Sequence, residues 1–252
     1  METFKAYLKK EVIESVRQYK YLIMLIGIIL FSILDPVILK LLPEILKNKI
    51  PGDLNLLIQI DMKTAVQNYI KDLSQISLLI VILTLMGTLS DEISSQKLIF
   101  PYSKGCNLSA VVISKILHHS AVLSIFIISG FSINYYYATT LFNKNVITFD
   151  KILISSLLMS LYFAFIVTLL IFFSSIFKKG IIAAISSVVF HVVLTILMNV
   201  VSMSKFIPYN LILTANSFNT DDIISTVLSV VLYCIILSIL TVKMINKSEL
   251  IY

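Results

Sequence analysis

Long apolar runs alternate with shorter polar segments along the whole chain. Several of these runs approach or exceed the ~20 residues that an α-helix needs to cross about 30 Å of hydrocarbon. Runs such as LLIVILTLM also lack the polar–apolar alternation of a membrane β-strand. The pattern therefore predicts an all-α membrane protein with six transmembrane helices. We expect them at about 21–34 with a possible continuation to Leu42, 75–89 with a possible extension over 70–73, 111–135, 152–177, 181–201 and 223–242.

Two segments outside these spans have the periodicity of amphipathic helices. In residues 1–20, apolar residues recur at helical spacing from Phe4 to Val16, and basic side chains fill the other faces. A basic helix of this kind lies in the plane of the lipid headgroups, so we expect an N-terminal interfacial helix. Residues 43–74, the longest predicted excursion outside the membrane, also contain a helical apolar repeat. We expect this segment to lie on the outer membrane surface or to pack over the bundle.

A third polar segment, residues 91–104, follows the second predicted span. Its charged residues and its proline are Asp91, Glu92, Lys97, Pro101 and Lys104. The segment has about the length of a short helix lying along a membrane surface. Lys115 opens the third span, and we expect its side chain to snorkel to the nearby headgroups.

The distribution of charge predicts how the chain crosses the membrane. Only 13% of the residues are charged and 58% are hydrophobic, so the formal net charge of +6 does not indicate a nucleic-acid partner. Lysine and arginine accumulate on the cytoplasmic side of membrane proteins. The basic N-terminal segment and the Lys178-Lys179 pair satisfy this rule if both termini are cytoplasmic. Abundant Ile, Lys and Asn are typical of an AT-rich bacterial genome, which favours a bacterial plasma membrane.

The common catalytic signatures are absent from the sequence. No glycine is followed by lysine, which excludes a Walker A phosphate loop. The motifs HExxH, GxSxG and CxxC are also missing. We therefore expect this chain to have no enzymatic activity and to bind no metal or cofactor itself.

Polar residues within the spans are candidates for a transport pathway or for packing inside the bundle. His191 and Asn199 lie on nearly the same face of the fifth span, and we favour hydrogen bonds to neighbouring helices over ligand binding or proton transfer. Asp35 lies near the outer boundary, where we expect it to be solvated and structural. For the adjacent His118 and His119 we favour a hydrated pair over a metal site. The serines and threonines of the spans either allow close helix packing or line a polar conduit, and the sequence leaves both open.

Taken in order, these features resemble the permease subunits of type-2 ABC (ABC-2) exporters over essentially all of residues 1–252. The resemblance rests on the interfacial helix, the large first outer loop, the acidic segment after the second span, and the run 101–104 followed by Lys115. The family pattern there is similar, with Pro-x-Ser/Thr-Arg and then a lysine that opens the third span. This chain departs from it with Lys104 in place of arginine, and with Ser95-Gln96 where a Gly-Thr pair often stands.

The resemblance implies a single permease domain whose segment 91–104 forms a cytoplasmic coupling helix between the second and third spans. This helix would dock on a separate ATPase through the five residues named above, with Glu92 entering a groove on the ATPase. The implied partners are two ABC ATPase subunits, which would bind ATP and Mg²⁺, and a second permease copy or paralogue. The implied function is the export of peptides, antimicrobials or other amphipathic compounds, for efflux or immunity.

Three other functions remain open at this point. A self-sufficient secondary transporter would need intramembrane ionisable groups and would favour inverted repeats. A membrane-embedded enzyme would need a cluster of acids, bases or metal ligands at depth. A non-transporting immunity or scaffold protein is also compatible with the sequence.

Overall fold

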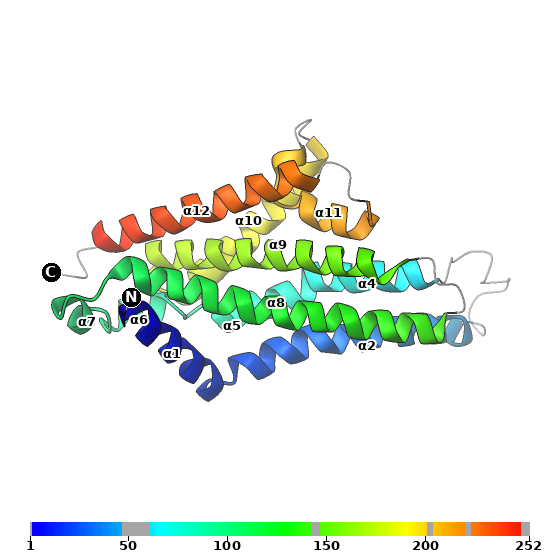
Figure 1. Cartoon of the computed structure of the whole chain (residues 1–252), viewed down its shortest axis with the longest axis horizontal. Coiled ribbons are helices and arrows are strands. Elements are labelled where there is room, and N and C mark those ends of the chain that lie inside the picture. The colour runs from blue at the N-terminus through cyan, green and yellow to red at the C-terminus, as the bar shows by residue number, and fades with distance from the viewer. Residues whose placement is uncertain (1, 47–60, 143–146, 201–203, 220–222, 248–252) are drawn as a thin grey trace.

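In a computed structural model the chain forms a bundle of long helices (Figure 1). The structure describes residues 2–46, 61–142, 147–200, 204–219 and 223–247. Within these ranges six helical segments are long and apolar enough to cross a membrane: Lys20–Ile45, Met62–Ser94, Leu108–Leu141, Phe149–Ile176, Gly180–Met198 and Ile223–Asn246. The prediction of an all-α, multi-pass membrane protein with six spans is thus confirmed.

Thirteen helical elements lie within the described residues. In order they are α1 (Glu2–Arg17), α2 (Lys20–Leu46), α4 (Met62–Asp72), the π-helix η1 (Leu73–Ser77), α5 (Leu78–Leu85), α6 (Ser90–Ser94), α7 (Ile99–Ser103), α8 (Leu108–Leu141), α9 (Phe149–Ile176), α10 (Gly180–Val200), the short 3-10 helix η2 (Ser204–Phe206), α11 (Asn210–Ser217) and α12 (Ile223–Lys247). The continuation of the first span beyond Leu34 is confirmed, because α2 runs through both Pro36 and Pro43.

The second span begins earlier than the sequence predicted. The amphipathic repeat expected on the outer surface is α4, which continues through η1 into α5 as one helical segment. Its apolar residues Ala65, Val66 and Tyr69 are buried, and α4 packs against α2, α8 and α11. The repeat therefore faces other helices rather than lipid headgroups. Of the two expectations for this repeat, the packing favours the one in which it packs on the bundle. The predicted start at residue 75 is wrong because the helical segment already begins at Met62. Residues 47–60 of the predicted loop lie outside the described residues.

Helix α9 forms the centre of the bundle. It packs against α8, α10, α11 and α12, and 72% of the residues in its apolar window are buried, compared with 22% in the fifth span and 11% in the sixth. The outward faces of α10 and α12 are apolar, as expected for helices in contact with lipid.

Ser156, Ser160 and Thr168 of α9 are buried and donate to carbonyl groups of their own helix. These hydroxyls therefore favour the close-packing interpretation over a polar conduit.

The N-terminal end of α1, helices α6 and α7, and the C-terminal end of α12 lie at the same end of the bundle (Figure 1). We call this the α1 end. The start of α10 also packs there, against the turn between α5 and α6. A Cβ atom on Gly180 would lie 2.8 Å from the carbonyl oxygen of Met86, so this close approach requires glycine.

Candidate functional site

The predicted surface segment 91–104 forms two short helices at the α1 end of the bundle. Helices α6 and α7 are separated by a turn in which Gln96 has a φ of 57°, so the segment is not one continuous helix. Asp91, Lys97 and Lys104 are exposed, and Pro101, inside α7, is half-buried. Four of the five predicted docking residues are thus at least partly accessible.

Glu92, the fifth residue, points into the protein and is buried. It accepts a hydrogen bond from Lys10 of α1, and its Oε1 lies 3.0 Å from Nζ of Lys115 in α8. Glu92 therefore joins α6 to α1 and α8 in this chain. With only 4% of the residue exposed, it is not presented to a groove on another protein.

Lys115 is the centre of this arrangement. Its side chain is 0% exposed, and its Nζ donates to Glu11 Oε1 at 2.5 Å and to the carbonyl oxygen of Thr88 at 3.0 Å. The prediction that Lys115 snorkels to the headgroups is wrong, because a buried ammonium group with two carboxylates and a carbonyl around it is already compensated. The buried ion pairs of Lys115 with Glu11 and Glu92, together with the Lys10–Glu92 contact, are called the α1 charge cluster below.

Two histidines extend this cluster along α8. His119 is fully buried, with its Nε2 3.4 Å from Oε2 of Glu11. His118 faces Tyr21, whose hydroxyl group lies 3.0 Å from its Nε2. The expectation of a hydrated histidine pair is therefore wrong, because both rings are enclosed by α1, α2 and α8. The side chains do point in different directions, which is consistent with their adjacent positions on one helix.

The environment of Glu11 keeps this carboxylate charged. Burial raises its pKa, but the contact with His119 and the positive charge of Lys115 more than offset this effect, and the pKa falls from 4.5 to about 2. At neutral pH the cluster therefore contains an ionised carboxylate next to the buried ammonium group of Lys115.

Helix α1 turns its polar side toward the bundle. Glu11 and Ser15, one turn apart, are its buried residues, whereas Val12, Ile13 and Val16 are exposed. This is the reverse of the arrangement in a water-soluble protein, and it suits a helix whose outer face contacts lipid. The burial pattern thus supports an interfacial location for α1 and explains its attachment through charged groups.

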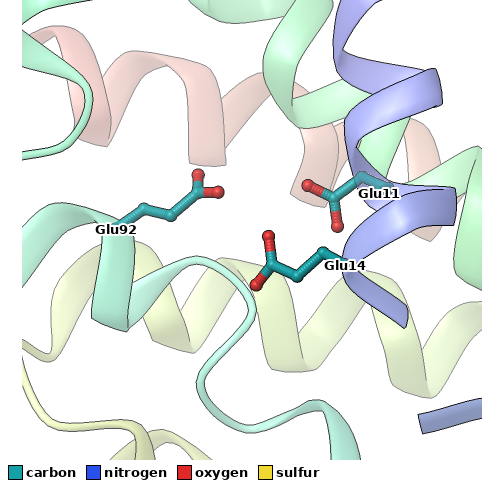
Figure 2. Close-up of side chains that lie close together, drawn as sticks. All are labelled: Glu11, Glu14 and Glu92. Atoms are coloured by element: carbon teal, nitrogen blue, oxygen red, sulfur yellow. The ribbon is translucent and has the colours of Figure 1, made fainter. Parts of the chain in front are cut away.

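Three carboxylates gather at this site (Figure 2). One oxygen each from Glu11, Glu14 and Glu92 lies within 4.8 Å of the others, an arrangement that could in principle hold a divalent cation. Two lysines already form ion pairs with these carboxylates. Lys115 contacts Glu11 and Glu92. Lys10 contacts Glu92 and lies 3.8 Å from Glu14. A metal ion would have to displace both ammonium groups, so we interpret the group as an ion-pair network.

The remaining predicted site residues lie in other parts of the bundle. His191 accepts or donates a hydrogen bond of 2.6 Å with the hydroxyl group of Tyr162, as expected for a packing histidine. Asp35 is buried rather than solvated, and it neighbours Asp72 of the second span. Asn199 belongs to α10, but its side chain lies outside the described residues. The structure therefore brings neither His191 nor Asp35 together with the α1 charge cluster.

Sequence reasoning missed the partners in the α1 charge cluster. One signal was available, because a lysine inside the apolar run VVISKIL requires a compensating group. The choice among the many carboxylates of the chain depends on tertiary contacts that no local pattern contains. Comparisons of the chain with models of protein families, with curated proteins and with solved structures found no match.

Proposed function

We propose that this chain is the membrane-embedded subunit of an ABC-2 type exporter, driven by a separate ATPase that docks on α6 and α7. The strongest support for this proposal is the connection between α6 and the membrane-associated helices. The exposed residues of this segment are connected through Glu92 to Lys115 in the third span and to Lys10 in α1. A force applied to α6 from outside the bundle would therefore reach two membrane-associated helices directly.

The docking surface in this proposal consists of exposed residues only. Asp91 and Lys97 on the α6 side, and Lys104 with the 71%-exposed ring of Phe100 on the α7 side, offer charge and an apolar contact to a partner. Aromatic side chains are enriched at protein interfaces and polar groups form the rim around them, so Phe100 would be the central contact and the charged residues its surroundings. Glu92 acts inside the chain, as the link from α6 to the spans.

The other parts of the proposal follow from the resemblance. The functional unit would contain two ATPase subunits, which bind ATP and Mg²⁺, and a second permease copy or paralogue. It would lie in a bacterial plasma membrane with both termini in the cytoplasm, and would export peptides, antimicrobials or other amphipathic compounds. Because α1, α6, α7 and the end of α12 share one end of the bundle, a single cytoplasmic side would present all of them to the ATPase.

Co-purification with matched charge-swap variants tests the docking proposal. The chain, with an affinity tag, is expressed in its native host, extracted in mild detergent and assayed for Mg²⁺-dependent ATP hydrolysis. We expect hydrolysis to co-purify with wild type and to be lost with Asp91→Lys/Lys97→Glu. The control Asp150→Lys/Lys151→Glu swaps two charges that are also exposed but lie at the start of α9, and it should retain the activity. Hydrolysis that is retained by the first variant, or absent with wild type, would refute the proposal.

A second candidate function rests on a different observation. Asp35 is buried in the first span with its Oδ2 lacking a hydrogen-bond partner, and Asp72 of the second span neighbours it. Carboxyl groups within membrane spans are typical of the proton relays of pumps and transporters. Proteoliposomes with an internal pH-sensitive dye test this alternative. Proton movement without any ATPase that is abolished by Asp35→Asn, or by His191→Ala, would favour it over the ATP-driven exporter.

A further inference from the structure

A cleft of about 940 Å³ opens at the α1 end of the bundle. Its lining comes from α1, with Lys9, Ile13 and Arg17, and from the end of α5 and the start of α10, with Leu83 and Ile181. Its volume falls within the ~300–1,000 Å³ of typical ligand pockets. The cleft is thus large enough to receive a ligand rather than single water molecules only.

The cleft carries an excess of positive charge. Five basic and three acidic side chains line it. Two of the acids are compensated by lysines of the same cleft, since Glu92 contacts Lys10, and Glu14 lies 3.8 Å from both Lys10 and Lys20. Among the described residues, Lys9, Arg17 and Lys97 form no ion pair, and Asp91 is the one remaining acid of the lining. The unneutralised cations favour an anionic ligand.

The position of the cleft along the bundle indicates which class of anionic ligand fits it. Lys20 and Gly180 begin the first and fifth spans, and Met86 directly follows α5, eight residues before the second span ends at Ser94, so these lining residues lie near the ends of their spans. The lining also includes apolar side chains such as Ile13 and Leu83, and the neighbouring Val16 of α1 is exposed. A ligand that satisfies both features has a phosphate group among the cations and hydrocarbon beside the apolar side chains.

We infer that this cleft binds the headgroup of an anionic phospholipid, with its phosphate near Lys9 and Arg17 and its acyl chains directed toward the lipid-facing sides of α1 and α10. Basic pockets between transmembrane helices are suited to anionic headgroups, and each nearby lysine or arginine strengthens binding about fivefold. The inference does not depend on the proposed ATPase, because the cleft belongs to this chain alone. It can therefore be tested with the chain purified by itself.

Native mass spectrometry of the delipidated chain measures the binding, with phosphatidylglycerol as the anionic probe and phosphatidylethanolamine as the zwitterionic one. We expect wild type to retain phosphatidylglycerol preferentially. Lys9→Gln/Arg17→Gln should weaken its binding on the order of 25-fold, because two contacts of about fivefold each are removed. The control Lys5→Gln/Lys104→Gln removes two exposed charges at the same end of the molecule but outside the cleft, and should change binding less than twofold.

Several results would overturn the inference. Equal retention of the two lipids by wild type excludes an anionic-headgroup site, and equal losses in the two double variants show that binding reflects overall charge. Inorganic phosphate that competes as strongly as phosphatidylglycerol identifies a free-anion site instead. A photoactivatable phosphatidylglycerol provides a check in wild type that needs no variant. Its crosslinks should concentrate in α1 and at the start of α10, and crosslinks spread evenly over α10 and α12 would contradict a defined site.

Discussion

Replacement of Lys115 by methionine is the sharpest test of the α1 charge cluster. The change keeps a long side chain in place but removes the ammonium group that contacts Glu11, Glu92 and the Thr88 carbonyl. Lys115 is 0% exposed and Glu11 is 1% exposed, so the Glu11 carboxylate cannot be rehydrated without a movement of α1. An exposed ion pair would contribute only about 0–1 kcal/mol. Loss of one partner from a buried pair costs about 3–5 kcal/mol.

The assay for this prediction is hydrogen–deuterium exchange of the purified chain. Each 1.4 kcal/mol corresponds to about a tenfold change in an opening equilibrium, so we expect the α1 and α6 amides to exchange about 10²–10³-fold faster in Lys115→Met. The amides of α12, which has no residue in the cluster, should change little. The triple variant Glu11→Gln/Glu92→Gln/Lys115→Met should recover most of the protection, because no uncompensated charge remains.

Two outcomes would refute this reasoning. Unchanged exchange of α1 and α6 in Lys115→Met would show that the buried ion pairs do not hold α1 in place. Equal acceleration in α12 would show that the whole bundle, rather than the attachment of α1, depends on this lysine. Lys151→Met serves as the control, because Lys151 is exposed near the start of α9 and should leave exchange throughout the protein unchanged.

Three further predictions follow from single contacts. Because the pKa of Glu11 falls from 4.5 to about 2, the ionised carboxylate contributes about 3 kcal/mol to stability above pH 4.5, and this contribution is lost as the pH falls toward 2. Protection of the α1 amides from exchange should therefore decline over this interval in wild type but not in Glu11→Gln. An identical decline in both proteins would contradict this prediction. Gly180→Ala places a Cβ atom 2.8 Å from the carbonyl oxygen of Met86 and should lower stability by about 1–3 kcal/mol, measured as a lower Tm in detergent. An unchanged Tm would argue against the close approach of α10 to Met86. Tyr162→Phe leaves His191 without its hydrogen bond and should lower stability by about 1–3 kcal/mol in the same assay. The control Tyr136→Phe, at an exposed site, should leave the Tm unchanged. Equal Tm values for the two variants would contradict a stabilising role of this hydrogen bond.

The resemblance to ABC-2 permeases remains a prediction, and the structure refines what it implies. The resemblance placed Glu92 in the docking surface, as part of the acidic segment that follows the second span. In the fold this side chain is buried and compensated by Lys10 and Lys115. The docking proposal therefore depends on Asp91, Lys97 and the α7 residues, and on Glu92 only as their connection to the spans.

The sequence by itself determined the class of the protein and the approximate positions of its spans. Hydrocarbon requires every spanning backbone to satisfy its own hydrogen bonds, so a long apolar run is sufficient to predict a membrane helix. This local requirement explains why five of the six spans were found close to their observed bounds. It failed at α4, whose polar face made it resemble a surface helix, because the helices that cover its apolar face come from distant parts of the chain.

Only the tertiary structure decided which charged residues work together. Lys115 pairs with a carboxylate 104 residues away, and Lys10 pairs with one 82 residues away, so no window of sequence contains either pair. The sequence required some partner for a lysine in an apolar run, since an isolated buried charge is too costly. Which glutamates fulfil this role depends on how α1, α6 and α8 meet, and that is set by packing over the whole bundle.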